Sequence, residues 1–95
     1  MAISIKIRYL AVLKGLSDPS ERPIDLNSDS LGELLDHLQL VESNALKSRL
    51  FAGGSALRAD VIVFINGVDS MLLGSKEAKL KDGDEVTFLP SVHGG

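Results

Sequence analysis

The residues most suited to chemistry stand at the end of the sequence, where Gly94 and Gly95 form a terminal pair. Glycine has no β-carbon, so a tail ending in two glycines can enter a narrow channel and leave its terminal carbonyl open to a nucleophile. Since glycine makes up about 7% of average sequences, two terminal glycines arise by chance in roughly 0.5% of chains. A free carboxylate is a poor electrophile, so we predict that the Gly95 carboxylate works after activation. We expect no protease to be needed to expose it.

Few other residues compete with this end of the chain. The sequence has no cysteine, so it offers no thiolate for catalysis or metal binding, and any sulfur must come from a partner. The two histidines, His37 and His93, are distant and lack a converging acidic set, so no metal site is predicted. His37 is expected to face solvent. We interpret His93 as a tail contact recognised by shape, in preference to a group that tunes the reactivity of the acyl end.

Composition favours one folded domain. The 95 residues are 44% apolar and 24% charged, as in an ordinary globular protein. We predict a domain over residues 1–90 and a flexible tail over 91–95. A count of 10 Lys and Arg against 13 Asp and Glu gives a net charge of −3, which does not favour direct binding of nucleic acid. No apolar run reaches the length of a membrane span, so we expect no membrane contact and a place in the cytoplasm.

The start of the chain has the pattern of a β-hairpin. Residues 3–9 alternate between apolar and polar side chains, which is typical of a strand with one buried face. A second strand around Ile24 should pair with it after a turn region. Pro23 cannot donate a ladder hydrogen bond, so we expect it at the start of that strand or at an edge of the sheet.

Two further strands are predicted in the second half of the chain. The apolar run 61–65 ends at the turn dipeptide Asn66-Gly67 and is interpreted as the central, most buried strand. A tight turn at 81–84 leads into a last strand over 85–89, which should finish just before Pro90.

Helices are expected between these strands. Ser30 and Glu33 have the spacing of a capping box, and leucines follow at helical intervals. A shorter helix should begin with Asn44 as its cap and stop at Gly53-Gly54, and 71–73 should form a short strand or turn. The order of elements predicts an α+β fold in which one main helix packs on one face of a mixed sheet.

The closing segment, residues 80–95 with the sequence LKDGDEVTFLPSVHGG, resembles that of the ubiquitin-like sulfur carriers. This family includes the small subunit of molybdopterin synthase (MoaD), the thiamine sulfur carrier (ThiS), the ubiquitin-related modifier and the small archaeal modifiers. Segments 5–11 (IKIRYLA) and 63–67 (VFING) are similar to the family's opening strand and to its central strand and turn. Leu-Pro-Ser-Val is similar to the molybdopterin subunit and His-Gly-Gly to the ubiquitin-related modifier, so the subfamily stays open. The resemblance implies a β-grasp, ubiquitin-like fold.

The resemblance also implies a carrier that is no enzyme but the substrate of an activating enzyme. That partner would use ATP and Mg²⁺ to adenylate the Gly95 carboxylate, while the chain itself would bind no cofactor. A sulfurtransferase would then help to form a thiocarboxylate that supplies sulfur for molybdopterin or tRNA thiolation, or a target-protein lysine would form an isopeptide bond. Two alternatives stay open: a small subunit of molybdopterin synthase whose tail enters the large subunit, and a β-grasp interaction module that does not use its tail.

Residues near the tail are expected to serve recognition by such partners. Pro90 should fix the direction in which the tail leaves the sheet, and Val92, His93 and Gly94 should be recognised with it.

An apolar patch is expected on the open face of the sheet. Leu89 should point away from the core, because the residues that alternate with it in the last strand take the inward positions. Together with Leu10 and with Phe64 or Ile62, as the resemblance suggests, Leu89 should form a docking surface for a partner protein.

Overall fold

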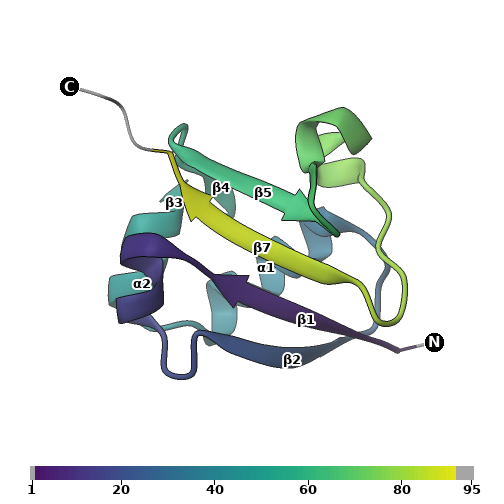
Figure 1. Ribbon diagram of the computed structural model, residues 1–95, viewed down its shortest axis with the longest axis horizontal. Coiled ribbons are helices and arrows are strands. Elements are labelled where there is room, and N and C mark those ends of the chain that lie inside the picture. Colours follow the sequence, from purple (N-terminus) through teal and green to yellow (C-terminus); the bar gives the residue numbers. More distant parts are fainter. Residues whose placement is uncertain (1, 92–95) are drawn as a thin grey trace.

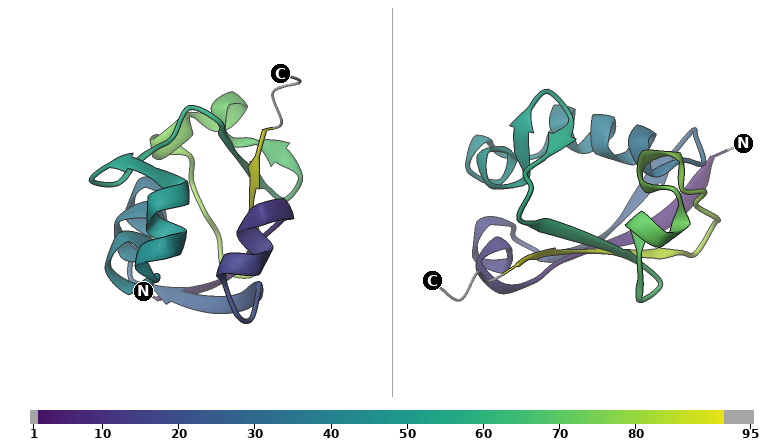
Figure 2. Two further views of the ribbon diagram at one scale, coloured as in Figure 1. Left: turned by 90° about the vertical axis from the view of Figure 1, so that its left-hand side faces the viewer. Right: turned by 90° about the horizontal axis from the view of Figure 1, so that it is seen from above.

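The computed structural model describes residues 2–91, which form a mixed β-sheet with helices on one of its faces (Figure 1). In chain order the elements are β1 (Ile3–Tyr9), the 3-10 helix η1 (Ala11–Leu16), β2 (Glu21–Leu26), α1 (Leu31–Val41), α2 (Asn44–Leu50), β3 (Phe51–Gly53), β4 (Ala56–Leu57), β5 (Val61–Ile65), β6 (Val68–Asp69), the 3-10 helices η2 (Ser70–Leu73) and η3 (Ser75–Glu77), and β7 (Glu85–Pro90). Figure 2 shows two layers, with α1, α2 and the β3–β4 hairpin on the same side of the main sheet. The predicted α+β arrangement is therefore confirmed.

β1 and β2 form the antiparallel hairpin expected at the start of the chain. Ile5, Ile7 and Tyr9 of β1 are buried, as the alternation predicts. Pro23 pairs with Lys6 in the ladder. Because β2 is the outermost strand of the sheet, the missing amide hydrogen of Pro23 does not interrupt another pairing. The predicted edge position of Pro23 is confirmed.

The five-stranded sheet has the order β2-β1-β7-β5-β6, so its central strand is β7. β7 runs parallel to β1 and antiparallel to β5. The prediction that residues 61–65 form the central, most buried strand is therefore wrong. β5 is apolar throughout because Val63 and Ile65 enter the core, while Ile62 and Phe64 lie half-buried on the opposite face of the sheet.

Side-chain caps start both α-helices. At α1 the Ser30 hydroxyl accepts a hydrogen bond from the Glu33 amide at 3.2 Å, as the capping-box spacing predicts. At α2 the Ser43 hydroxyl accepts from the Leu46 amide at 3.3 Å. The assignment of this cap to Asn44 is therefore wrong, and Asn44 is the first residue of the helix.

Two short segments also differ from expectation. Phe51 leaves α2 and begins β3, so the glycine pair does not end the helix: Gly53 closes β3 and Gly54 lies in the turn before β4 with φ at 56°. Met71 belongs to the 3-10 helix η2 and not to a short strand or turn, because the Asp69 carboxylate accepts from the Met71 amide at 2.9 Å and caps that helix.

The core lies between the sheet and the two α-helices. Leucines of α1 and α2 pack against the inward residues of β1, β5 and β7. Tyr9 and Phe88 are buried on neighbouring strands, with ring centroids 5.4 Å apart. Over residues 2–91 no helix is long and apolar enough to cross a membrane. The other face of the sheet has no α-helix over it in the described part of the chain, and it holds most of the candidate site.

Candidate functional site: the tail root and the open sheet face

The tail leaves the sheet from β7, beside the start of β5. Pro90 pairs with Val61, and the Ser91 amide donates to the Asp60 carbonyl at 2.5 Å. The strand therefore includes Pro90, and the prediction that it ends before this residue is wrong. Ser91 and Asp60 form a hydrogen-bonded pair, and in an antiparallel ladder the next residue directs its backbone nitrogen to the other side. The Pro90 nitrogen therefore faces away from β5, toward the side of β1, which ends at Tyr9. Pro90 is buried, and its role in directing the tail stays a prediction.

A contact from α2 holds the residue that receives the tail. Arg49 Nη1 lies 3.0 Å from Asp60 Oδ2. The Asp60 carbonyl accepts a hydrogen bond from the Ser91 amide, and the Asp60 carboxylate forms the ion pair with Arg49. Asp60 therefore connects the start of the tail to α2. We call Arg49, Asp60 and Ser91 the tail root. Sequence reasoning missed Arg49 and Asp60, because only the folded pairing of β5 with β7 brings them to the tail.

The last four residues, which carry the predicted chemistry, lie outside the described residues: Val92, His93, Gly94 and Gly95. Their predicted roles in tail recognition and activation stay predictions. The same holds for the division of the chain into a domain over 1–90 and a flexible tail over 91–95.

Beside the tail root, the open face of the sheet carries apolar side chains from three neighbouring segments. Leu89 of β7 pairs with Ile62 of β5, and Phe64 lies two residues further along β5 on the same face. Leu10 follows β1 and its amide donates to the Phe88 carbonyl at 3.1 Å, which places Leu10 alongside β7. All four of these apolar side chains are half-buried, and we call them the apolar patch: Leu10, Ile62, Phe64 and Leu89. The structure thus brings the predicted residues together, and both β5 candidates take part.

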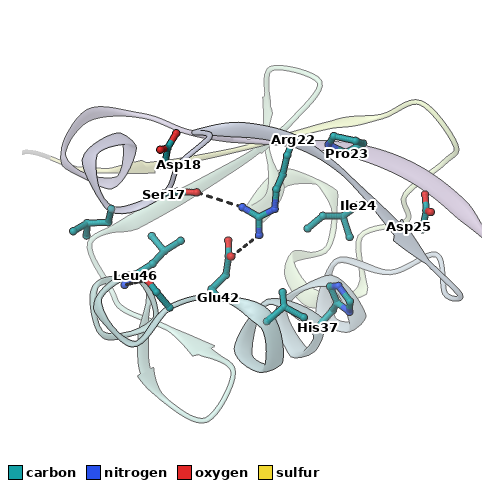
Figure 3. A pocket seen from close by; sticks show the side chains of 12 residues that line it. Ser17, Asp18, Arg22, Pro23, Ile24, Asp25, His37, Glu42 and Leu46 are labelled. Atoms are coloured by element: carbon teal, nitrogen blue, oxygen red, sulfur yellow. Dashed lines mark hydrogen bonds and ion pairs between the residues drawn. The ribbon is translucent and has the colours of Figure 1, made fainter.

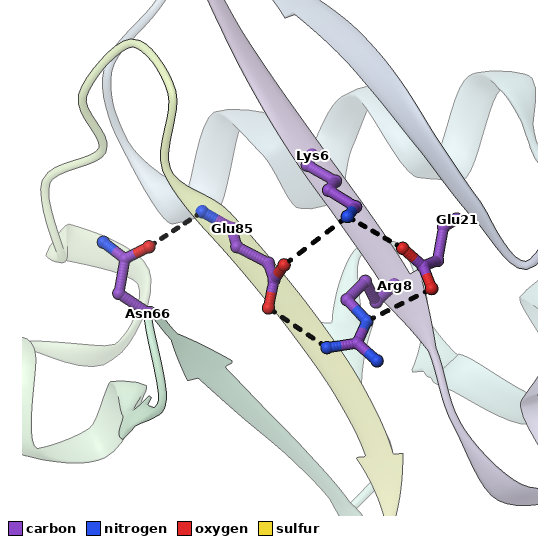
Figure 4. Close-up of polar contacts among 5 residues, drawn as sticks. All are labelled: Lys6, Arg8, Glu21, Asn66 and Glu85. Carbon is purple, nitrogen blue, oxygen red and sulfur yellow. Dashed lines mark hydrogen bonds and ion pairs between the residues drawn. The ribbon is translucent and has the colours of Figure 1, made fainter.

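The same face continues into four charged side chains on β1, β2 and β7 (Figure 4). Lys6 Nζ lies 2.9 Å from Glu21 Oε1 and 3.8 Å from Glu85 Oε2. Arg8 reaches both acids, with Nη1 3.3 Å from Glu85 Oε1 and Nε 3.6 Å from Glu21 Oε2. We call Lys6, Arg8, Glu21 and Glu85 the charged cluster. Each cation faces two acids, so the cluster presents alternating charge next to the apolar patch.

Hydrogen bonding within the charged cluster affects one titration. The hydrogen bond from Lys6 holds the pKa of Glu21 below its usual value, and the positive charges nearby act in the same direction.

Asn66 fixes the start of β7, since its side-chain oxygen accepts a hydrogen bond from the Glu85 amide at 2.9 Å. Sequence reasoning missed this cluster, although Lys6 and Arg8 at the outward positions of the first strand were a signal for it.

A second polar group fills a hollow between β2 and the end of α1 (Figure 3). Arg22 points into it from β2, donates to the Glu42 carboxylate, and also reaches Ser17 Oγ at 3.3 Å. The Tyr9 hydroxyl donates to the same carboxylate, and burial followed by this hydrogen bond raises the pKa of Tyr9. His37, expected to face solvent, is half-buried and lines this hollow. The network connects β1, β2 and the end of α1, so its role is to stabilise the fold. Within residues 2–91, no group of three His, Asp or Glu side chains is placed to hold a metal ion.

The fold and the exit of the tail define a class: ubiquitin-like β-grasp proteins, in which a helix packs on a mixed sheet and the central last strand leads into the C-terminal tail. The profile of one family in this class, Urm1 (Ubiquitin related modifier), matches residues 4–95. The chain therefore belongs to the ubiquitin-related modifier family of sulfur carriers and protein modifiers. This confirms the recognised family and its β-grasp fold.

Individual relatives agree with this assignment. Ubiquitin-related modifier 1 of Schizosaccharomyces pombe is 39% identical over 72 residues, which cover 75% of this chain and 73% of that protein. Small archaeal modifier protein 1 of Methanosarcina acetivorans superimposes with a TM-score of 0.84 at 28% identity, over 100% of this chain and 99% of that chain. A putative molybdopterin converting factor, subunit 1, of Pyrococcus furiosus gives a TM-score of 0.72 at 26% identity, over 95% and 99% of the two chains. Matches to named relatives span from 56% to 74% of the relative's own length.

Proposed function

We propose that a partner enzyme adenylates the Gly95 carboxylate and that the activated tail then accepts sulfur. The carboxylate oxygen attacks the α-phosphorus of ATP and displaces pyrophosphate. The terminal sulfur of a persulfide on the sulfur donor attacks the resulting acyl carbon, and AMP leaves with the bonding electron pair. A second thiol then attacks the donor-side sulfur of the acyl disulfide, so that a disulfide forms and the thiocarboxylate leaves. The observation that carries this proposal is the family match, which extends through the terminal glycines to residue 95.

In this proposal the chain is a substrate and carrier, and the partner holds ATP and Mg²⁺. The described residues of the chain hold the start of the tail in place. The tail root directs the chain out of the sheet at Ser91, whose amide is held by Asp60. A tail that starts from a fixed point loses less conformational entropy when it enters a partner's channel. We also propose that the protein acts in the cytoplasm, where ATP is available for this activation.

The apolar patch is the proposed docking surface for the activating enzyme. Leu89 lies two residues before Ser91, so a partner bound there is next to the tail. Half-buried apolar side chains on an open sheet face lose the rest of their water when a partner covers them. The neighbouring charged cluster can fix the orientation of the partner, since charged rims contribute mainly to specificity and association rate.

The mass of the intact protein purified from its native cells tests the carrier proposal. We expect a fraction of the full-length chain to gain the mass difference of one sulfur replacing one oxygen. Oxidation adds a similar mass, so a reagent that alkylates thiol groups must convert the same fraction. A chain lacking Gly94 and Gly95 is the matched control and should show neither change. Full-length protein that never reacts with the reagent would contradict the proposal.

A second candidate function, protein modification, is favoured by relatives that are named as modifiers. Here the amine of a target lysine attacks the same acyl adenylate and AMP leaves, forming an isopeptide bond. Tryptic digests of cell extracts should then contain lysines that carry the remnant 82–95, because Lys81 is the last residue after which trypsin cleaves. These remnants should disappear when the only copy of the chain lacks Gly95, and their absence from cells with the full-length chain would contradict this function.

The similarity to a molybdopterin converting factor subunit favours a third arrangement. In it the tail enters the large subunit of a molybdopterin synthase, with which this chain should form a stable complex on size-exclusion chromatography. Tail-dependent binding would support that role. Binding that survives loss of Gly94 and Gly95, with no thiocarboxylate and no lysine adducts, would instead indicate an interaction module.

A further inference from the structure

The outer edge of β5 is only partly covered by another strand. β5 pairs with β7 along its whole length, whereas β6 pairs only with Phe64 and Ile65. In the part of the chain that the structure describes, Val61–Val63 therefore have no strand on this side, which is the upper edge of the sheet in Figure 1. Ile62 exchanges hydrogen bonds with β7, so the backbone groups of Val61 and Val63 point to this edge. The Val61 amide already donates to the Arg58 carbonyl at 3.1 Å, the Val61 carbonyl faces the open edge, and the Val63 amide faces it from a recessed position. Such groups are the ones to which an added strand binds.

This edge borders an apolar groove with a volume of about 440 Å³. Helix α1, the segment before β5, and the 3-10 helices η2 and η3 supply its other walls. Apolar side chains of these walls and of β5 include Leu31, Leu35, Leu57, Val61, Val63 and Met71. Met71 is 78% exposed, so apolar surface lies in water at the mouth of the groove. An apolar groove beside an uncovered strand edge suits an extended peptide, because the backbone supplies hydrogen bonds and the groove receives alternate side chains.

The charges around the groove select what can bind. Arg58 and Lys76 line it from two different walls and are both exposed. Within residues 2–91 the Arg58 side chain makes only a long hydrogen bond, of 3.4 Å, to the Ser48 carbonyl. Asp69 also lines the groove, but its carboxylate is engaged in capping η2 through the Met71 amide. The groove is thus locally positive in a chain of net charge −3, which favours an acidic residue in the ligand.

We propose that this groove binds an extended segment of a partner protein, in which apolar residues alternate and acidic residues flank them. The segment adds a strand to β5, turns its apolar side chains toward α1, and places an acidic residue near Arg58 or Lys76. The site is separate from the chemistry of the tail, so it would bring a substrate or regulator to the carrier independently of activation.

A second folded copy of the chain is a poorer occupant than a slender segment. Val63 is only 2% exposed, so the free edge is recessed, and η2 stands beside it (Figure 1). Two copies with equally recessed edges cannot bring their β5 strands into hydrogen-bonding distance. The opposite edge of the sheet is protected in another way, because β2 carries Pro23 and exposed acids at Glu21 and Asp25.

Nuclear magnetic resonance titration of the ¹⁵N-labelled protein tests the proposal. The probe is a synthetic peptide in which alternating isoleucine and valine residues are flanked by aspartates. We expect the largest amide shifts at Val61–Val63, with further shifts near Leu57 and Met71. A peptide with lysine flanks should bind roughly tenfold more weakly. Shifts centred on Leu10, Phe64 and Leu89 or on β2, or no shifts at millimolar peptide, would overturn the proposal.

Three controls separate strand addition from unspecific binding. The double variant Arg58→Glu with Lys76→Glu should reverse the preference between acidic and basic flanks, and an unchanged preference would contradict the charge argument. N-methylation of alternate peptide amides should abolish binding, because it removes the donors and keeps the side chains. A chain lacking Gly94 and Gly95 should bind the peptide as the full chain does, so the groove can be tested even if the proposed activation fails. Dimerisation on concentration that shifts the same β5 amides would overturn the proposal in favour of a second copy.

Discussion

Strand β7 carries apolar residues on both of its faces, and the two faces differ in what covers them. Val86 and Phe88 point toward the helices and are completely buried. Leu89 points to the open face and stays half-buried in the described part of the chain. Burial is therefore already complete on one face, while a partner can still bury surface on the other. Substitutions on the covered face should change the free energy of unfolding, and those on the open face should change docking.

The largest effect is expected for Phe88→Ala on the covered face. The substitution removes the ring that lies against Tyr9 and leaves a cavity in the core. Truncation of a buried phenylalanine costs about 3–5 kcal/mol in the free energy of unfolding. Urea denaturation of the wild type and the variant measures this loss. A loss as small as that of an open-face variant would break the distinction between the two faces.

Tyr9→Phe should have an intermediate effect, because it removes only the hydroxyl that donates to Glu42. Loss of a hydrogen bond to a charged group costs about 1.5–3 kcal/mol. Arg22 still pairs with Glu42 in the variant, which favours the lower end of that range. Thermal unfolding at neutral pH provides the measurement. An increase in stability would show that the hydroxyl destabilises the core.

The Tyr9 hydroxyl also predicts a specific pH dependence. Burial raises the pKa of Tyr9 in the folded state, whereas the unfolded phenol ionises near its ordinary value of 10.0. The contribution of the neutral hydroxyl is therefore fully present below that pH and is lost as the pH rises above it. Wild-type stability should fall more steeply than that of Tyr9→Phe on the alkaline side. Parallel curves would contradict this cause.

On the open face, Leu89→Ala should separate docking from stability. Its side chain is half-buried, so the expected loss in the free energy of unfolding is about 1 kcal/mol or less. The concentration of chain required for half-maximal adenylation by the activating enzyme should rise, because part of the apolar patch is gone. Leu40→Ala is the matched control, since Leu40 is 83% exposed on α1 and distant from the patch. Equal behaviour of both variants would exclude the patch as the docking surface.

The smallest change is expected for Glu21→Gln in the charged cluster. Because Lys6 lowers the pKa of Glu21 below 4.5, the carboxylate stabilises the fold above that pH, and the contribution is lost as the pH falls through the lowered pKa. Wild type and variant should therefore differ slightly at neutral pH and converge in acid. Added salt should reduce the neutral-pH difference, since the side chain is exposed. A difference that persists in acid would point to a contact other than the ion pair.

Sequence patterns predicted the features that depend on local periodicity. The opening hairpin, the capped helix α1 and the outward position of Leu89 follow from alternation and spacing within single segments. The turn at 81–84 is confirmed by the hydrogen bond from the Asp84 amide to the Lys81 carbonyl at 3.0 Å. These features need no knowledge of distant partners.

Features that depend on distant strands could not be predicted in this way. β5 was expected at the centre because an apolar run looks the same whether its second face is covered by a helix or left open, as it is for Ile62 and Phe64. The tail root and the charged cluster require the pairing of β7 with β5 and β1, which joins segments far apart in the sequence. The cap at Ser43 was missed because Asn44 beside it is also a good capping residue.

The central position of β7 has a consequence for the folding of the chain during its synthesis. Among the strands that the structure describes, β7 is the last to leave the ribosome, and both β1 and β5 pair with it. The sheet therefore cannot close until β7 has emerged, because its central ladder contacts are long-range. A product truncated before β7 lacks the strand that joins the two halves of the sheet and is exposed to proteolysis. Only a molecule that has been synthesised through β7 can reach the native state. Every folded molecule therefore carries the strand from which its tail departs.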